Sequence, residues 1–109
     1  MIIDFPNMPV EVLPSFKGGE KELSLQSFDD GKNKIMHGIL MPGASIGLHK
    51  HEQDSEILFV LSGKGLLIDD GKELKIVHGQ CAYCPVGHEH SLINSSEDTD
   101  LEYYAVVVR

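Results

Sequence analysis

Short apolar runs along this chain are separated by clusters of Gly, Pro, Asn and Asp. These clusters recur roughly every 8–12 residues, the spacing typical of a β-sandwich or β-barrel. No window shows a 3.6-residue apolar period over the length of a helix. The pattern therefore predicts an all-β protein. The expected strands cover residues 22–28, 33–41, 44–49, 56–62, 65–69, 72–77, 80–85, 89–94 and 101–108.

Three local features refine this prediction. Asp70-Gly71 lies between two apolar runs and is a strong signal for a two-residue hairpin. Residues 7–14 contain two prolines around a short apolar piece, which predicts an edge strand. Residues 101–108, LEYYAVVV, are apolar at almost every position, so we expect this strand to be covered on both faces. Together these features indicate a closed or nearly closed all-β architecture.

Composition narrows the possible partners. The chain has 109 residues, enough for one hydrophobic core, and carries nine Lys plus Arg against 17 Asp plus Glu, a net charge of −8. Such acidity disfavours nucleic acid and anionic membranes as partners. No apolar run is long enough to cross a bilayer, and the first residues lack the pattern of a secretory signal. With only two cysteines, these features predict a cytoplasmic protein.

Four potential metal ligands stand out in two stretches, residues 43–63 and 79–94. His49 and His51 lie two residues apart, so on a strand their side chains share one face. A polar turn then leads to Glu56, and His90 follows in a separate hairpin. Three imidazoles and one carboxylate suit a single divalent transition metal (Mn, Fe, Co, Ni, Cu or Zn) better than Ca or Mg. The remaining regularly spaced residues are turn formers and Asn: Gly43, Gly63, Gly79, Pro85, Gly87 and Asn94.

The two stretches resemble the motifs of the cupin superfamily, G-x5-H-x-H-x4-E-x6-G and G-x5-P-x-G-x2-H-x3-N, at every defining position. The resemblance implies an all-β, double-stranded β-helix, the cupin jelly-roll barrel, as a single domain over residues 1–109. Its N-terminal strands would lie within residues 1–30 and its barrel core within 33–109. The resemblance also implies that the four residues above hold the metal inside the barrel. Small cupins are commonly dimers, so we expect a homodimer.

Other polar residues near the motifs have weaker cases. His88 shares its parity with His90 and is a candidate base or gate, while Tyr83 is a candidate proton carrier if its face lines the barrel. Cys81 and Cys84 form a C-x-x-C within a predicted strand. A spacing of three residues places the thiols on opposite faces, which predicts two buried, inert cysteines rather than a disulfide.

The surroundings of the site suggest the kind of ligand. The single arginine, Arg109, is the last residue of the chain, and Lys34 is the main lysine expected on a strand. A pocket without these cations would favour a small, neutral or singly charged, oxygen-bearing substrate that binds the metal directly. The sequence thus predicts a metal-dependent enzyme of dioxygenase or decarboxylase type. The alternatives are a metal-dependent isomerase or epimerase, and a non-catalytic module that binds a small molecule or metal.

Overall fold

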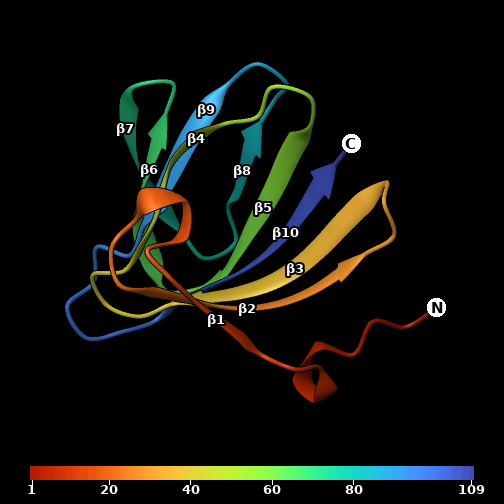
Figure 1. Cartoon of the computed structure of the whole chain (residues 1–109). Coiled ribbons are helices and arrows are strands. Elements are labelled where there is room, and N and C mark those ends of the chain that lie inside the picture. The colour runs from red at the N-terminus through yellow and green to blue at the C-terminus, as the bar shows by residue number, and fades with distance from the viewer.

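The computed structural model describes residues 1–109 and contains ten strands, two short 3-10 turns and no α-helix (Figure 1). No helix is present that could reach across a membrane. The elements are η1 (Phe5–Asn7), β1 (Glu11–Pro14), η2 (Phe16–Gly18), β2 (Glu22–Asp29), β3 (Asn33–Leu40), β4 (Ser45–Lys50), β5 (Ser55–Ser62), β6 (Lys64–Asp69), β7 (Lys72–Val77), β8 (Cys81–Cys84), β9 (Glu89–Ile93) and β10 (Leu101–Val108).

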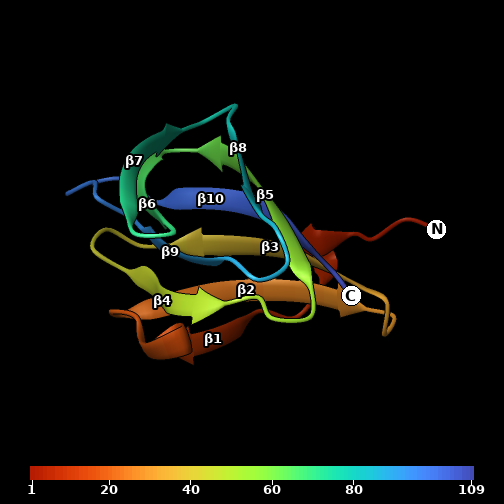
Figure 2. The ribbon, with the colours of Figure 1, turned by 90° about the horizontal axis from the view of Figure 1, so that it is seen from above.

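The strands form two antiparallel sheets that enclose one core (Figures 1 and 2). The larger sheet has the order β1-β2-β3-β10-β5-β8, and the smaller has the order β4-β9-β6-β7. Fifteen buried residues form a single hydrophobic cluster, which includes Leu23, Leu40 and Leu101 at 1% exposure or less. Burial of this apolar surface is the main force that holds the two sheets together.

The all-β prediction is confirmed, and each of the expected strands is present with its ends within one residue. The hairpin at Asp70-Gly71 is confirmed as well, since both residues have positive φ (46° and 83°) and link the paired Asp69 and Lys72. Positive φ at both central positions is the requirement of a type I′ turn. The predicted edge strand is shorter than expected, because residues 5–7 form a 3-10 turn and pairing begins at Glu11.

The prediction that residues 101–108 are covered on both faces is wrong. β10 lies between β3 and β5, and its inward residues Tyr103 and Ala105 are buried against the opposite sheet. The outward Tyr104 is 41% exposed. Only the N-terminal segment covers it in part, through Phe5, whose ring stacks on Tyr104 with centroids 5.6 Å apart. The apolar residues on the outer face of β10 are therefore only partly covered, although the sequence of the strand is apolar on both faces.

Candidate metal site

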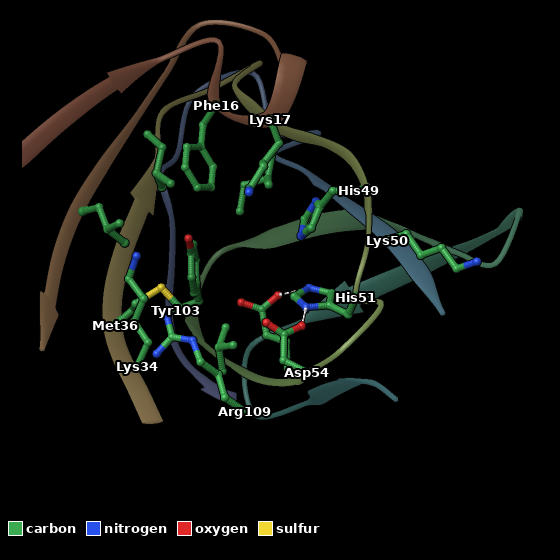
Figure 3. Close-up of a pocket in the computed structure, with 15 residues that line it drawn as sticks. Phe16, Lys17, Lys34, Met36, His49, Lys50, His51, Asp54, Tyr103 and Arg109 are labelled. Atoms are coloured by element: carbon green, nitrogen blue, oxygen red, sulfur yellow. Dashed lines mark hydrogen bonds and ion pairs between the residues drawn. The ribbon is translucent and has the colours of Figure 1, made fainter. Parts of the chain in front are cut away.

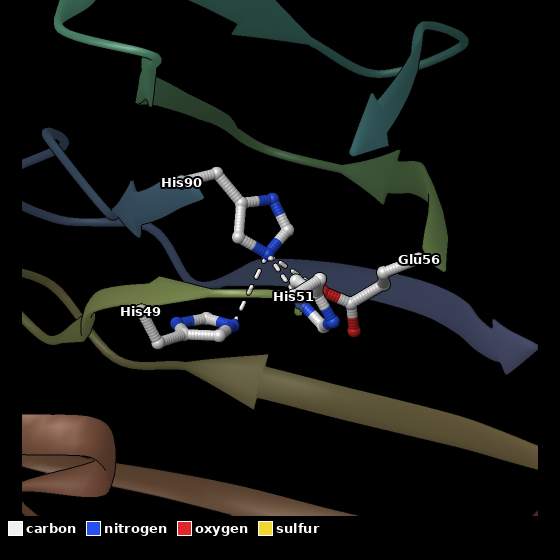
Figure 4. Close-up of side chains that lie close together, drawn as sticks. All are labelled: His49, His51, Glu56 and His90. Atoms are coloured by element: carbon white, nitrogen blue, oxygen red, sulfur yellow. Dashed lines mark hydrogen bonds and ion pairs between the residues drawn. The ribbon is translucent and has the colours of Figure 1, made fainter. Parts of the chain in front are cut away.

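The structure brings together the four potential ligands predicted from the sequence (Figure 4). The Nε2 atom of His90 lies 3.1 Å from the Nε2 atoms of His49 and His51, and 2.8 Å from Oε1 of Glu56. His49 on β4 pairs directly with His90 on β9, whereas Glu56 comes from β5 of the other sheet. His51 follows β4 in the loop that joins the two sheets. The cluster therefore spans both sheets.

Hydrogen bonds fix how two of the imidazoles face the cluster. Nδ1 of His49 donates to the carbonyl oxygen of Gly47 at 2.8 Å, and Nδ1 of His51 donates to Oδ1 of Asp54 at 2.6 Å. In a neutral ring with a protonated Nδ1, the Nε2 atom carries a lone pair. The cluster thus points imidazole lone pairs and a carboxylate at one another, an arrangement that a cation stabilises.

The spacing of the donor atoms also fits a single ion. Two ligand atoms about 2.1 Å from a metal and at right angles are separated by about 3 Å. The Nε2 atoms of neighbouring histidines in the cluster are 3.1 Å apart, and all four donors lie within 4.8 Å of one another. Nitrogen and oxygen donors in this proportion suit a divalent transition metal.

Electrostatics favour an ionised carboxylate in the cluster. Burial by itself would raise the pKa of Glu56, but the close His51 and His90 rings outweigh it and lower that pKa to about 2. In return, Glu56 and then Asp54 raise the pKa of His51 above its ordinary value, even though burial opposes this shift. Burial lowers the pKa of His49. Glu56 is therefore charged at neutral pH, and His49 is held as a neutral ligand.

The cluster opens into a cavity of about 240 Å³ between the sheets (Figure 3). His49, His51 and Glu56 form part of its wall. The apolar part of the wall comes from both sheets and from η2: Phe16, Leu23, Leu25, Met36, Ile46, Tyr103 and Val107. A cavity that combines apolar walls with convergent polar groups is the usual form of a small-molecule binding site.

The expectation of a pocket without basic side chains is wrong. The cavity wall also includes Lys17, Lys34, Lys50 and Arg109. Lys34 shares its inward parity on β3 with the buried Met36, and Arg109 continues β10 towards β2, where it pairs with Asp29. Whether such a side chain faces the cavity depends on which face of its strand the second sheet covers, and the sequence does not specify this. With cations in the wall, an anionic ligand is favoured rather than disfavoured.

Neither predicted proton carrier lines the cavity. Tyr83 lies on the outer face of β8 and is 58% exposed. His88 also points away from the site, and its Nδ1 interacts with the carboxylate of Asp70 in the β6–β7 hairpin. Cys81 and Cys84 occupy opposite faces of β8 and form no disulfide, as expected, but Cys81 is exposed. Burial raises the pKa of Cys84 to about 11, which makes that thiol unreactive at neutral pH.

The sequence did not single out Tyr103, which is the tyrosine that reaches the cavity. It is 2% exposed and forms part of the wall, and none of the side-chain hydrogen bonds of the chain involves its hydroxyl (Figure 3). Burial raises the pKa of this phenol, so it remains protonated and able to donate. Tyr103 shares one face of the strand with Ala105 and Val107, and this alternation could have identified it as an inward residue. Because Tyr104 is equally apolar, however, the sequence does not show which of the two faces is the inner one.

Loss of the Asp54 carboxylate should weaken metal binding without removing a ligand. Asp54 accepts the Nδ1 proton of His51 and so orients that ring. Partners of this kind contribute about 10–100-fold to metal affinity. We expect Asp54→Ala to raise the dissociation constant by this factor, measured by competition with a chromophoric chelator. Replacement of Glu73, an exposed acid on β7 outside the cavity wall, should leave the constant unchanged.

Comparison with known proteins supports the resemblance. Residues 36–107 match the family model described as Cupin domain. The chain is 32% identical to the oxalate-binding protein of Thermotoga maritima, over 99% of this chain and 93% of that protein. A solved structure of a predicted oxalate decarboxylase from Thermotoga maritima aligns with a TM-score of 0.93 at 32% identity, over 99% of this chain and 98% of that one. A sugar phosphate isomerase of Silicibacter pomeroyi aligns with a TM-score of 0.80 at 25% identity, over 100% of this chain and 76% of that one.

The matched region extends across both motif stretches and includes all four residues of the cluster. The two facing antiparallel sheets correspond to the double-stranded β-helix that the motifs imply. The chain therefore belongs to the cupin family.

Proposed function

We propose that this cupin binds one divalent transition metal through His49, His51, Glu56 and His90 and acts on a small organic acid, as a decarboxylase or dioxygenase. The observation that carries the proposal is the cluster itself, since it opens into a cavity with basic side chains in its wall. Three neutral imidazoles and one carboxylate leave a net positive charge on a divalent ion, which favours an anionic ligand. The name of the Thermotoga maritima relative, an oxalate-binding protein, supports a carboxylate as that ligand.

The residues around the cluster have distinct roles in this proposal. A bound transition metal would supply a Lewis acid for a carboxylate oxygen of the ligand. Asp54 and the carbonyl of Gly47 hold the His51 and His49 rings in place. The protonated hydroxyl of Tyr103 is available to donate a hydrogen bond to the ligand. The apolar wall excludes water and strengthens these polar interactions.

Elemental analysis of protein purified without added metal tests the first part of the proposal. We expect about one transition metal ion per chain in the wild type, almost none in His51→Ala, and a wild-type content in His78→Ala, whose histidine is exposed in a turn. Manganese or iron would agree with decarboxylation or oxygen chemistry. A His51→Ala variant with as much metal as the wild type would contradict the site.

The second part of the proposal concerns turnover. Oxalate, used as a short carboxylate probe, should bind to the metal-loaded protein, and the release of formate and carbon dioxide or the uptake of oxygen would identify the type of reaction. The name of the Thermotoga maritima relative favours one alternative, a binding module without turnover. Tight oxalate binding with neither product formation nor oxygen uptake would select that alternative.

A further inference from the structure

Lys34 is a lysine directed into the barrel with no partner there. It lies on β3 with the same parity as Met36 and Leu40, which are 7% and 0% exposed, and it lines the cavity (Figure 3). Lysine side chains are seldom placed on an inward face unless a partner meets the charge. The ion pairs and side-chain hydrogen bonds of the chain include none made by Lys34.

The acid that could have neutralised Lys34 is already occupied. Asp29 lies opposite Lys34 in the β2–β3 register. Its two carboxylate oxygens accept hydrogen bonds from Nη1 and Nη2 of Arg109 at 2.8 and 3.0 Å, and Oδ1 also accepts one from the amide of Gly31. No Asp29 oxygen comes within ion-pair distance of Lys34. Lys34 therefore makes no close ion pair within the chain, and its charge acts on Asp29 only as a minor, longer-range contribution.

The register fixes the separation between the backbones of Lys34 and Glu56, a member of the cluster. Val107 on β10 pairs with Lys34 on one side and with Glu56 on the other, so the three residues form one row across the larger sheet. Two strand spacings separate the backbones of Lys34 and Glu56, about 10 Å. Apolar side chains, those of Val107 and Met36, line the wall between the cation and the cluster.

This layout matches a ligand with two charged ends and an apolar middle. We propose that the ligand is a linear dicarboxylic acid longer than oxalate, with one carboxylate at the metal cluster and the other bound by Lys34. Oxalate, whose two carboxyl carbons are directly bonded, is much shorter than this backbone separation. The proposal rests on the proposed function, because the near carboxylate needs the metal.

The other basic side chains of the wall are less suited to this role. The ammonium of Lys17 lies over the ring of Phe16, 5.6 Å from its centroid. Lys50 points away from the cluster in Figure 3, and Arg109 is bound to Asp29. Lys34 is thus the cation of the wall that is both inward-facing and unpaired.

Calorimetric titration of the manganese-loaded protein tests the proposal with pairs of acids of equal carbon number, such as succinate against butyrate. We expect the wild type to bind the dicarboxylate about tenfold or more tightly, the effect of one charge-assisted hydrogen bond. Malonate and glutarate define which length fits. Lys34→Met should bring the two acids within about twofold of each other, mainly by weakening the dicarboxylate. Lys72→Met, on the exposed β7, should keep the wild-type preference.

The outcomes separate this inference from the proposed function. A wild type that holds its metal but binds both acids equally would overturn the role of Lys34 and leave the metal site standing. The role of Lys34 would also be overturned if Lys34→Met kept the preference for the dicarboxylate, or if Lys17→Met lost that preference. Metal content, measured on each variant, shows that the barrel is folded, and Lys34→Gln provides a second neutral variant. A wild type that takes up no metal would instead contradict the proposed function itself.

Discussion

Removal of the proposed metal with a chelator should lower the melting temperature of this protein by about 15 °C. A ligand that binds only the folded state adds about 4 kcal/mol when its free concentration is a thousand times its dissociation constant. For a domain of about this size, 1 kcal/mol corresponds to about 4 °C. Without the ion, the Nε2 atoms of the three histidines lie close to one another and to the charged Glu56 in a largely buried cluster.

Differential scanning calorimetry with and without chelator measures this effect. His51→Ala should melt at the same temperature in both conditions, and His78→Ala should retain the full difference. If His51→Ala is as sensitive to the chelator as the wild type, the metal lies elsewhere in the chain.

The same difference should depend on pH in a definite direction. Glu56 and Asp54 raise the pKa of His51 above its ordinary value of 6.5, whereas the metal binds the neutral ring. Protons therefore compete with the metal already near neutrality, and Glu56, with a pKa of about 2, stays charged throughout. The stabilisation by metal should shrink as the pH falls from about 8 to about 5. A difference that grows on acidification would contradict histidine ligation.

The metal cluster was predictable from the sequence because the spacing of residues close together along the chain determines it. Two histidines with period two share a strand face, and the glycines around them mark where the chain turns. Gly43, Gly63, Gly79 and Gly87 all adopt positive φ, between 80° and 89°, as turn residues should. The spacing of these turns sets which strands meet, and therefore which side chains converge.

The rest of the cavity was not predictable from the sequence, because its information is non-local. On β3, Lys34 and Met36 point inward while Ile35 and Ile39 point outward, so hydrophobicity does not separate the faces. On β10, Tyr103 and Tyr104 are chemically identical, and only the position of the second sheet decides which one is buried. Period-two patterns identify an inner face only when the outer face is polar.

The close packing of Tyr103 on Gly38 leads to the second large effect. The two residues are partners in the β3–β10 register, and the tyrosine ring lies over the glycine. A Cβ atom at position 38 would lie 2.3 Å from Cζ and 2.5 Å from the hydroxyl oxygen of Tyr103. The ring is 2% exposed, with Val60 as its partner on β5, so it has little room to withdraw.

We expect Gly38→Ala to lower the free energy of unfolding by about 2–3 kcal/mol, the usual cost of an overpacked core, despite the gain in strand propensity. Chemical denaturation measures the loss. In a Tyr103→Val background the added methyl group should cost less than about 0.5 kcal/mol, since the ring is gone, and a double-mutant cycle isolates this coupling. Tyr103→Phe alone should change stability by less than about 0.5 kcal/mol, because none of the side-chain hydrogen bonds of the chain involves its hydroxyl. An equal cost of Gly38→Ala in both backgrounds would show that the tyrosine ring does not confine this position.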